Sequence, residues 1–178
     1  MTEKKILIAV DLQNDFINGA LGTGEAQAIV QPAVACIRRC KEQGYTMIAT
    51  LDTHQENYMN TLEGKKLPVP HCIKGTAGWQ PNDAVADALG DCILVEKPTF
   101  GSTDLPAVVA GEAAGCDKLT IMLIGLCTDI CVVSNALMLK AHFTDAEIIV
   151  NAACCAGVTP EKHQAALETM RSCQIDVI

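Results

Sequence analysis

The side chain best suited to chemistry in this chain is the thiol of Cys131, which follows the apolar run 119–126 and a short turn. The run is typical of a buried strand, and the residues after the turn are typical of a helix. The first turn of a helix carries unpaired N–H groups and the positive end of the helix dipole, so we expect a thiol there to be biased toward the thiolate. Cys131 is therefore a candidate nucleophile. Taken alone, however, a structural role as a small apolar residue of the core would explain it at least as well.

Two other strand ends carry groups that could act with this thiol. The apolar run 6–10 ends at Asp11, and the run 92–95 is followed by Lys97, which Pro98 holds in an extended conformation. Alone, Asp11 could cap a loop and Lys97 could be a surface lysine. Because parallel strands end at the same edge of a sheet, these two residues and Cys131 can meet there. A nucleophile, a proton acceptor and a cation in one crevice favour amide hydrolysis.

A metal-ligand pattern follows another strand. Asp52 and His54 come after the apolar run 45–51 and, two residues apart in extended backbone, their side chains point the same way. His71, from the long and weakly periodic segment 53–80, would complete a set of two histidines and one carboxylate. Glu63 is the available fourth ligand. Alone, Asp-x-His most often marks a polar strand end.

Three further polar residues carry no such pattern. We expect Asp15 to accept hydrogen bonds from loop amides, and His142 and His163 to lie on the surface.

The elements that must position these groups alternate between strand and helix. Strands are expected at 6–10, 45–51, 92–95, 119–126 and 146–150, with a short edge strand at 175–178. Helices are expected at 25–43, 82–89, 105–114, 129–142 and 160–172, with a loop at 151–159. This order predicts an α/β fold, a three-layer αβα sandwich around a doubly wound, mostly parallel six-stranded sheet. No repeat or linker composition interrupts it, so we expect a single domain over residues 1–178.

Composition excludes several classes of partner. A net charge of −8 without a basic run argues against nucleic acid and anionic membranes, and favours a small molecule or a protein. Only five apolar residues precede Asp11, too few for a signal peptide, and no run approaches the length of a membrane span. We therefore expect a cytoplasmic protein whose ten cysteines are mostly reduced and packed in the core.

Three motifs resemble those of the isochorismatase-like cysteine hydrolases, in the same order and across essentially the whole chain. They are Val-Asp-Leu-Gln-Asn-Asp-Phe at 10–16, Glu-Lys-Pro-Thr-Phe-Gly-Ser-Thr-Asp-Leu at 96–105 and Gly-Leu-Cys-Thr-Asp-Ile-Cys-Val at 125–132. Within that family, Asp52-Thr53-His54, Glu63 and the segment 70–76 are similar to nicotinamidases (pyrazinamidases). Metal-free members lack that set, and isochorismatase itself has no cysteine at position 131.

The resemblance implies a mechanism. Asp11 would take the proton of the Cys131 thiol while Lys97 holds Asp11 ionised, and the thiolate would form a thioester with the substrate. The backbone N–H groups of Cys127 and Cys131 would stabilise the oxyanion, and a cis peptide bond is implied at Leu126–Cys127. One divalent metal, Zn²⁺ first and Fe²⁺ or Mn²⁺ as alternatives, would be held by Asp52, His54, Glu63 and His71 and would orient nicotinamide through its ring nitrogen.

The substrate pocket is harder to predict, because aromatic residues are only 3% of the chain. Phe16, Trp79 and Phe100 lie near the motifs and are the expected substrate contacts. Three hypotheses follow: a nicotinamidase, a metal-free amidase acting on a carbamoyl or ureido substrate, and an inactive family member that serves as a binding module. The set of Asp11, Lys97 and Cys131 disfavours the last, and the metal-ligand pattern favours the first. We also expect a homo-oligomer.

Overall fold

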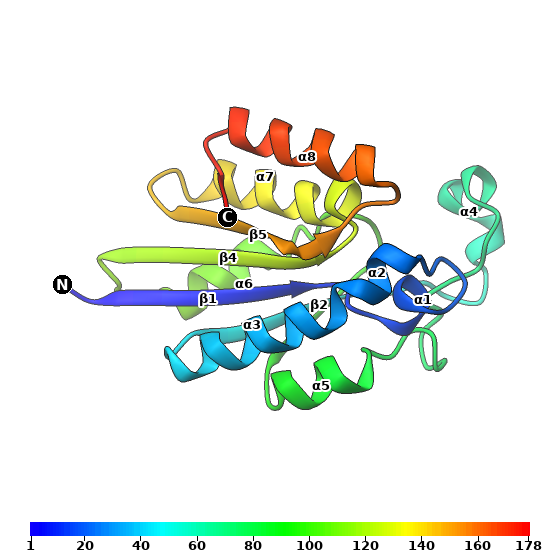
Figure 1. The fold of residues 1–178 in the computed structure, drawn as a ribbon, viewed down its shortest axis with the longest axis horizontal. Coiled ribbons are helices and arrows are strands. Elements are labelled where there is room, and N and C mark those ends of the chain that lie inside the picture. Colours follow the sequence, from blue (N-terminus) through cyan, green and yellow to red (C-terminus); the bar gives the residue numbers. More distant parts are fainter.

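A computed structural model describes residues 1–178 and contains one six-stranded sheet in which every strand pair is parallel (Figure 1). The strand order is β3-β2-β1-β4-β5-β6, so the chain winds outward in both directions from β1 and β4. This confirms the predicted doubly wound sandwich and makes its sheet wholly parallel. The strands are β1 (Glu3–Val10), β2 (Thr46–Asp52), β3 (Ile93–Lys97), β4 (Lys118–Leu126), β5 (Glu147–Ala156) and β6 (Asp176–Val177).

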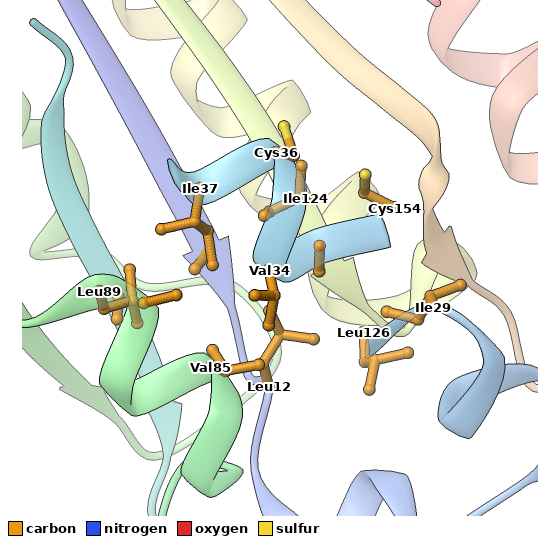
Figure 2. Close-up of a cluster of buried hydrophobic side chains, with 14 of the residues drawn as sticks. Leu12, Ile29, Val34, Cys36, Ile37, Val85, Leu89, Ile124, Leu126 and Cys154 are labelled. Carbon is orange, nitrogen blue, oxygen red and sulfur yellow. The ribbon is translucent and has the colours of Figure 1, made fainter. Parts of the chain in front are cut away.

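Helices cover both faces of the sheet and give it two cores. One core has 23 buried residues from the inner face of α3, from α5 and from one face of the strands; Figure 2 shows Val34 and Ile37 of α3 against Val85 and Leu89 of α5. The other core has 20 buried residues and packs α6, α7 and α8 against the opposite face. The helices are α1 (Asn14–Ile17), α2 (Gly24–Ala28), α3 (Val30–Glu42), η1 (Tyr58–Asn60), α4 (Leu62–Lys66), α5 (Asp83–Leu89), α6 (Leu105–Glu112), η2 (Thr128–Val132), α7 (Val133–His142) and α8 (Pro160–Ser172).

The helix expected at 25–43 and the loop expected at 151–159 differ from the sequence prediction. The helix expected at 25–43 is interrupted at Ile29, whose backbone caps α2 and opens α3 while its side chain packs into the core. The loop expected at 151–159 is largely strand, because residues 151–156 extend β5 past a register shift and pair Cys155 with Gly125. Neither the tertiary burial of Ile29 nor this pairing with β4 leaves a local sequence signal.

The carboxyl ends of the central strands meet where the strand order reverses. Val10 of β1 lies between Thr50 of β2 and Gly125 of β4, and Asp52 pairs with Lys97 across β2 and β3. Open α/β sheets bind their ligands at this position. The predicted convergence of strand ends is therefore a direct result of the parallel register.

Candidate active site

Asp11, Lys97 and Cys131 form one buried cluster at the strand ends. Lys97 Nζ lies 2.6 Å from Asp11 Oδ2 and 3.5 Å from Cys131 Sγ. It also donates a hydrogen bond to the carbonyl of Thr99 at 3.0 Å. Asp11 and Lys97 are at most 1% exposed and Cys131 is 5% exposed. The three predicted groups, from β1, β3 and the turn after β4, are thus in contact.

The carboxylate of Asp11 has one oxygen bound and one available. Thr50 donates a hydrogen bond to Oδ1 at 2.7 Å. Oδ2 pairs with the Lys97 ammonium at 2.6 Å and, as a carboxylate oxygen with a second lone pair, can still accept a proton. Burial raises the pKa of Asp11 and the nearby charge of Asp52 adds to the rise, while the Lys97 charge opposes both.

Cys131 sits in a wider turn than expected. The residues 128–132 form a π-helical turn, in which Val132 N donates to Cys127 O at 3.1 Å before the regular helix α7 begins. Burial is the main cause that raises the pKa of the Cys131 thiol well above its usual value, and the negative charge of Asp11 adds to the rise. The Lys97 charge only partly offsets it. This opposes the expected bias toward the thiolate, because burial beside Asp11 favours the protonated thiol.

The two predicted oxyanion donors lie on this same turn. The backbone N–H of Cys127 donates no hydrogen bond within the protein, so it is available to a ligand. The peptide bond between Leu126 and Cys127 is cis, as the family resemblance implied.

Asp52, His54 and His71 form a second cluster beside the first. One ligand atom from each lies within 4.8 Å of the others, and all three residues are buried. Asp52 Oδ2 is 2.9 Å from His54 Nε2 and 3.4 Å from His71 Nε2. Glu63 stands at the rim, with Oε1 3.6 Å from His54 Nε2 and 3.9 Å from His71 Nε2. The two clusters touch, because Lys97 Nζ is 3.7 Å from Asp52 Oδ1.

Two backbone contacts return His71 to the sheet edge. His54 N donates to Cys72 O, and Lys74 N donates to His54 O. The later part of the segment 53–80, here called the excursion, therefore pairs with a residue at its start. Asp15 accepts a hydrogen bond from Cys72 N at 2.8 Å, which confirms its predicted role. His71 Nδ1 is hydrogen-bonded to Val69 O at 2.8 Å, which directs Nε2 into the cluster.

The electrostatics of this cluster favour a cation. Burial alone would raise the pKa of Asp52, but hydrogen bonds with His54 and His71 and the Lys97 charge hold it well below its usual value. Burial would lower the pKa of His71, yet the hydrogen bonds with Asp52 and Val69 O raise it. Burial raises the pKa of Glu63. A buried carboxylate between two imidazoles is a donor set that suits a divalent transition metal.

A cavity of about 240 Å³ opens beside both clusters. Its lining includes Cys127 and Cys131 as well as Asp52, Glu63 and His71, and no lysine or arginine is among its lining residues. His54 lines an adjoining groove, which shares Glu63 and Phe100 with the cavity. The remaining lining is largely apolar: Phe16, Leu21, Thr23, Ala26, Leu67, Phe100, Ile130, Gly157 and Val158.

Phe16 and Phe100 therefore line the cavity, but Trp79 does not. The indole N–H of Trp79 donates to Thr53 Oγ1 at 2.9 Å, and its carbonyl accepts a hydrogen bond from Gln13 Nε2. The ring packs against the core on the α3 side of the sheet. The loop that carries Trp79 is hydrogen-bonded to α1 through the carbonyls of Gly78 and Gln80. Trp79 therefore supports the end of β2 and does not contact the cavity.

The sequence analysis gave no supporting role to three residues that hold the site in place. Gln13 is fully buried and bonds both the N–H and the carbonyl of Asp52. Asn135, also fully buried, bonds Cys131 O, Phe100 O and Ser102 N. His163, expected on the surface, is half-buried and lies against Thr128. Their positions in the sequence carry no chemical pattern, although Gln13 stands inside the first family motif.

Comparison with known proteins agrees with this geometry. The Isochorismatase domain matches residues 5–178. An isochorismatase family protein of Bacillus subtilis is 30% identical, with 92% of each chain covered. The structure of Pyrococcus horikoshii pyrazinamidase in complex with zinc superposes with a TM-score of 0.82 at 28% identity, covering 98% of both chains. That of Streptococcus mutans pyrazinamidase/nicotinamidase gives a TM-score of 0.85 at 27% identity, covering 98% of this chain and all of the other. The chain belongs to the isochorismatase family and is a hydrolase.

Proposed function

We propose that this protein is a metal-containing cysteine amidohydrolase that converts nicotinamide to nicotinate and ammonia. One observation carries the proposal: the cavity lined by Cys131 is also lined by Asp52 and His71, two members of a buried set of two histidines and one carboxylate. The named pyrazinamidase and nicotinamidase relatives support the same substrate class. A nucleophile beside a metal-ligand set is what an amide with a Lewis-basic ring would require.

The first step is thiol activation. Asp11 Oδ2, the buried oxygen with a free lone pair, accepts the proton of the Cys131 thiol as sulfur attacks the amide carbon. Lys97 holds Asp11 ionised before the transfer and faces the developing thiolate at 3.5 Å. Its pKa is raised: burial alone would lower it, but the charges of Asp11 and Cys131 outweigh that effect. Proton transfer inside this ion-paired cluster makes a resting thiolate unnecessary.

The remaining steps conserve atoms and protons. The N–H groups of Cys127 and Cys131 stabilise the oxyanion, and the C–N bond then breaks as Asp11 returns the proton to the leaving ammonia. This leaves an acyl thioester on Cys131. Water, deprotonated by Asp11, attacks the thioester carbon, and the C–S bond breaks to release the carboxylic acid. Asp11 then returns the proton to the departing Cys131 thiolate, which restores the free thiol and the ionised base.

The buried donor atoms fit a metal, and Asp52, His54 and His71 would hold it, with Glu63 at the rim. When bound, a divalent ion there supplies a Lewis-acid contact for the substrate's ring nitrogen. Phe16 and Phe100 line the space that the ring would occupy. The absence of a lysine or arginine from the lining favours a neutral amide over a substrate that carries a carboxylate.

Ammonia release from nicotinamide by the purified protein tests this proposal. Wild type should be active, and Cys131→Ala should lose all measurable turnover while keeping its melting temperature, since the thiol performs the chemical step and fills little of the core. Substantial activity in Cys131→Ala would remove the thioester mechanism.

The second candidate is a metal-free amidase acting on a carbamoyl or ureido compound. The buried thiol cluster is compatible with it, since none of its contacts requires a metal. It becomes the better reading if the protein neither contains a divalent metal nor gains activity on nicotinamide when Zn²⁺, Fe²⁺ or Mn²⁺ is added.

A further inference from the structure

Two hydrogen bonds hold the turn that carries Cys131 against the start of α8 and the loop before it. Thr128 Oγ1 and His163 Nδ1 lie 2.7 Å apart and share a hydrogen bond, and Thr128 is fully buried. One residue further along the turn, Asp129 Oδ1 accepts a hydrogen bond from Val158 N at 3.0 Å. The first contact joins η2 to the first turn of α8, and the second joins it to the loop between β5 and α8, 35 and 29 residues away in the chain.

This segment fits the turn closely. A Cβ at Gly157 would lie 2.7 Å from His163 N and 3.0 Å from Asp129 Oδ1, so no larger residue fits without a shift of the backbone. Gly157 and Val158 also line the cavity together with Cys127 and Cys131. The two contacts therefore fix the position of the nucleophile's turn relative to the part of the cavity lining formed by Gly157 and Val158.

The turn needs such support from outside. A π-helical turn is rarer and less regular than an α-helical one, and its own hydrogen bonds hold it less firmly. Cys127 N, the proposed oxyanion donor with no partner in the protein, belongs to the residue directly before Thr128. Its direction thus depends on how Thr128 is held, and a small misplacement of an oxyanion donor is costly.

We propose that Thr128 and His163 are a pair of positioning residues that aim the oxyanion donors of the turn. The inference rests on the proposed amide hydrolysis. Neither side chain touches the reacting atoms. The pair acts on the transition state, in which the oxyanion forms, and leaves the thiol and the metal-ligand set as they are.

Four variants test the pair, with nicotinamide turnover, the alkylation rate of the Cys131 peptide by iodoacetamide, and thermal melting as readouts. Thr128→Val and His163→Phe keep the shape but remove the hydrogen bond, and should lower kcat by about tenfold to a hundredfold, somewhat less than the loss of a whole oxyanion donor. KM and the alkylation rate should stay within about twofold, since these do not depend on the oxyanion. Thr128→Ser and His163→Gln keep a hydrogen-bonding partner and should retain most of kcat.

The double variant Thr128→Val/His163→Phe should be no worse than either single variant, because both remove the same bond. Gln164→Ala, an exposed change on α8, is the matched control and should match wild type. The inference is overturned if His163→Phe keeps full kcat, if Thr128→Ser is as impaired as Thr128→Val, or if the two losses add. Absence of wild-type activity on nicotinamide would instead count against the proposed function itself.

Discussion

At the scale of single residues, Lys97 shows how burial changes what a side chain does. In the sequence it could have been an ordinary surface lysine, but in the fold it is 1% exposed and surrounded by Asp11, Thr99 O and Cys131. An ammonium in this position is costly unless it is paired, and its charge in turn opposes the rise in the pKa of Asp11 that burial causes. The charge state of the proposed base therefore depends on a neighbour that contacts no substrate.

We predict that Lys97→Met lowers kcat for nicotinamide at least a hundredfold, an order expected for loss of general-base assistance. Without the cation, burial and Asp52 would favour protonated Asp11, which cannot accept the thiol proton. The unfolding free energy should also fall, by about 3–5 kcal/mol for a broken buried ion pair. Steady-state kinetics and urea denaturation measure both effects.

Lys74→Met is the matched control. Lys74 pairs with Glu96 at the surface, where its side chain is 49% exposed, and surface pairs contribute little. Both its rate and its stability should remain near wild type. Equal behaviour of the two variants would contradict the role given to Lys97.

At the scale of elements, the close approach of β1 and β4 decides where Asp11 and Cys131 stand. Gly125 has φ +123°, and a Cβ there would overlap the carbonyl oxygen of Val10 on the neighbouring strand. Asp11 itself has φ +48°, so the chain turns sharply out of β1 at the site. Glycine at 125 is required both by its conformation and by the lack of space.

Gly125→Ala should therefore destabilise the protein by about 2–4 kcal/mol, combining backbone strain with overpacking. Gly111→Ala, the control, lies near the end of α6 with no atom near its Cβ position, and should be neutral or slightly stabilising. Urea denaturation of the two variants and wild type measures this contrast. A Gly125→Ala protein as stable as Gly111→Ala would mean that the two strands can separate at low cost.

Helix α8 carries a pH-dependent contribution to stability. Burial lowers the pKa of His163, and the charge of Asp129 opposes this only in part. Folding therefore favours the neutral ring, so this contribution is present above the ordinary histidine value of about 6.5 and is lost as pH falls below it. Between pH 7 and 5 the unfolding free energy of wild type should fall more steeply than that of His163→Gln. Parallel curves in urea denaturation would show that burial of His163 does not disfavour its charged form.

At the scale of the whole molecule, the excursion 53–80 is an addition to the sheet that supplies His54, Glu63 and His71 to the site. Its helix α4 stands out from the body of the protein (Figure 1), and it returns to the sheet edge through the pairing of His54 with Ile73. The metal-ligand set joins the end of β2 to this excursion. A bound metal would therefore both orient substrate and hold the excursion in place.

We predict that purified protein contains about one divalent metal per chain, as one set of ligands implies. Chelation should abolish nicotinamide turnover and lower the melting temperature, and Zn²⁺, Fe²⁺ or Mn²⁺ should restore both. His54→Ala should raise KM at least tenfold and reduce metal content, since it removes one of three buried ligands.

His142→Ala is the control for this variant, because His142 is exposed at the end of α7. It should keep metal, KM and melting temperature. Elemental analysis and calorimetry with and without chelator decide the matter. Full activity in chelated protein would contradict the metal-dependent mechanism.

The pattern of apolar runs and turns along the chain was sufficient to predict the fold class and the convergence of Asp11, Lys97 and Cys131. The physical reason is that apolar runs of strand length, alternating with helical segments, permit a parallel sheet, and a parallel sheet brings all strand ends to one edge. The pairing of Asp52 with His54 was predictable in the same way, since it needs only the two-residue repeat of extended backbone.

Only the tertiary structure decided what surrounds these groups. The return of His71 depends on Cys72 meeting Asp15 and His54, the turning away of Trp79 depends on Thr53, and the contact of His163 depends on the turn at Thr128. The raised pKa of the Cys131 thiol likewise follows from its burial beside Asp11. Each is a contact between distant parts of the chain or a consequence of desolvation, and neither leaves a periodic trace in the local sequence, because both arise only when the core closes.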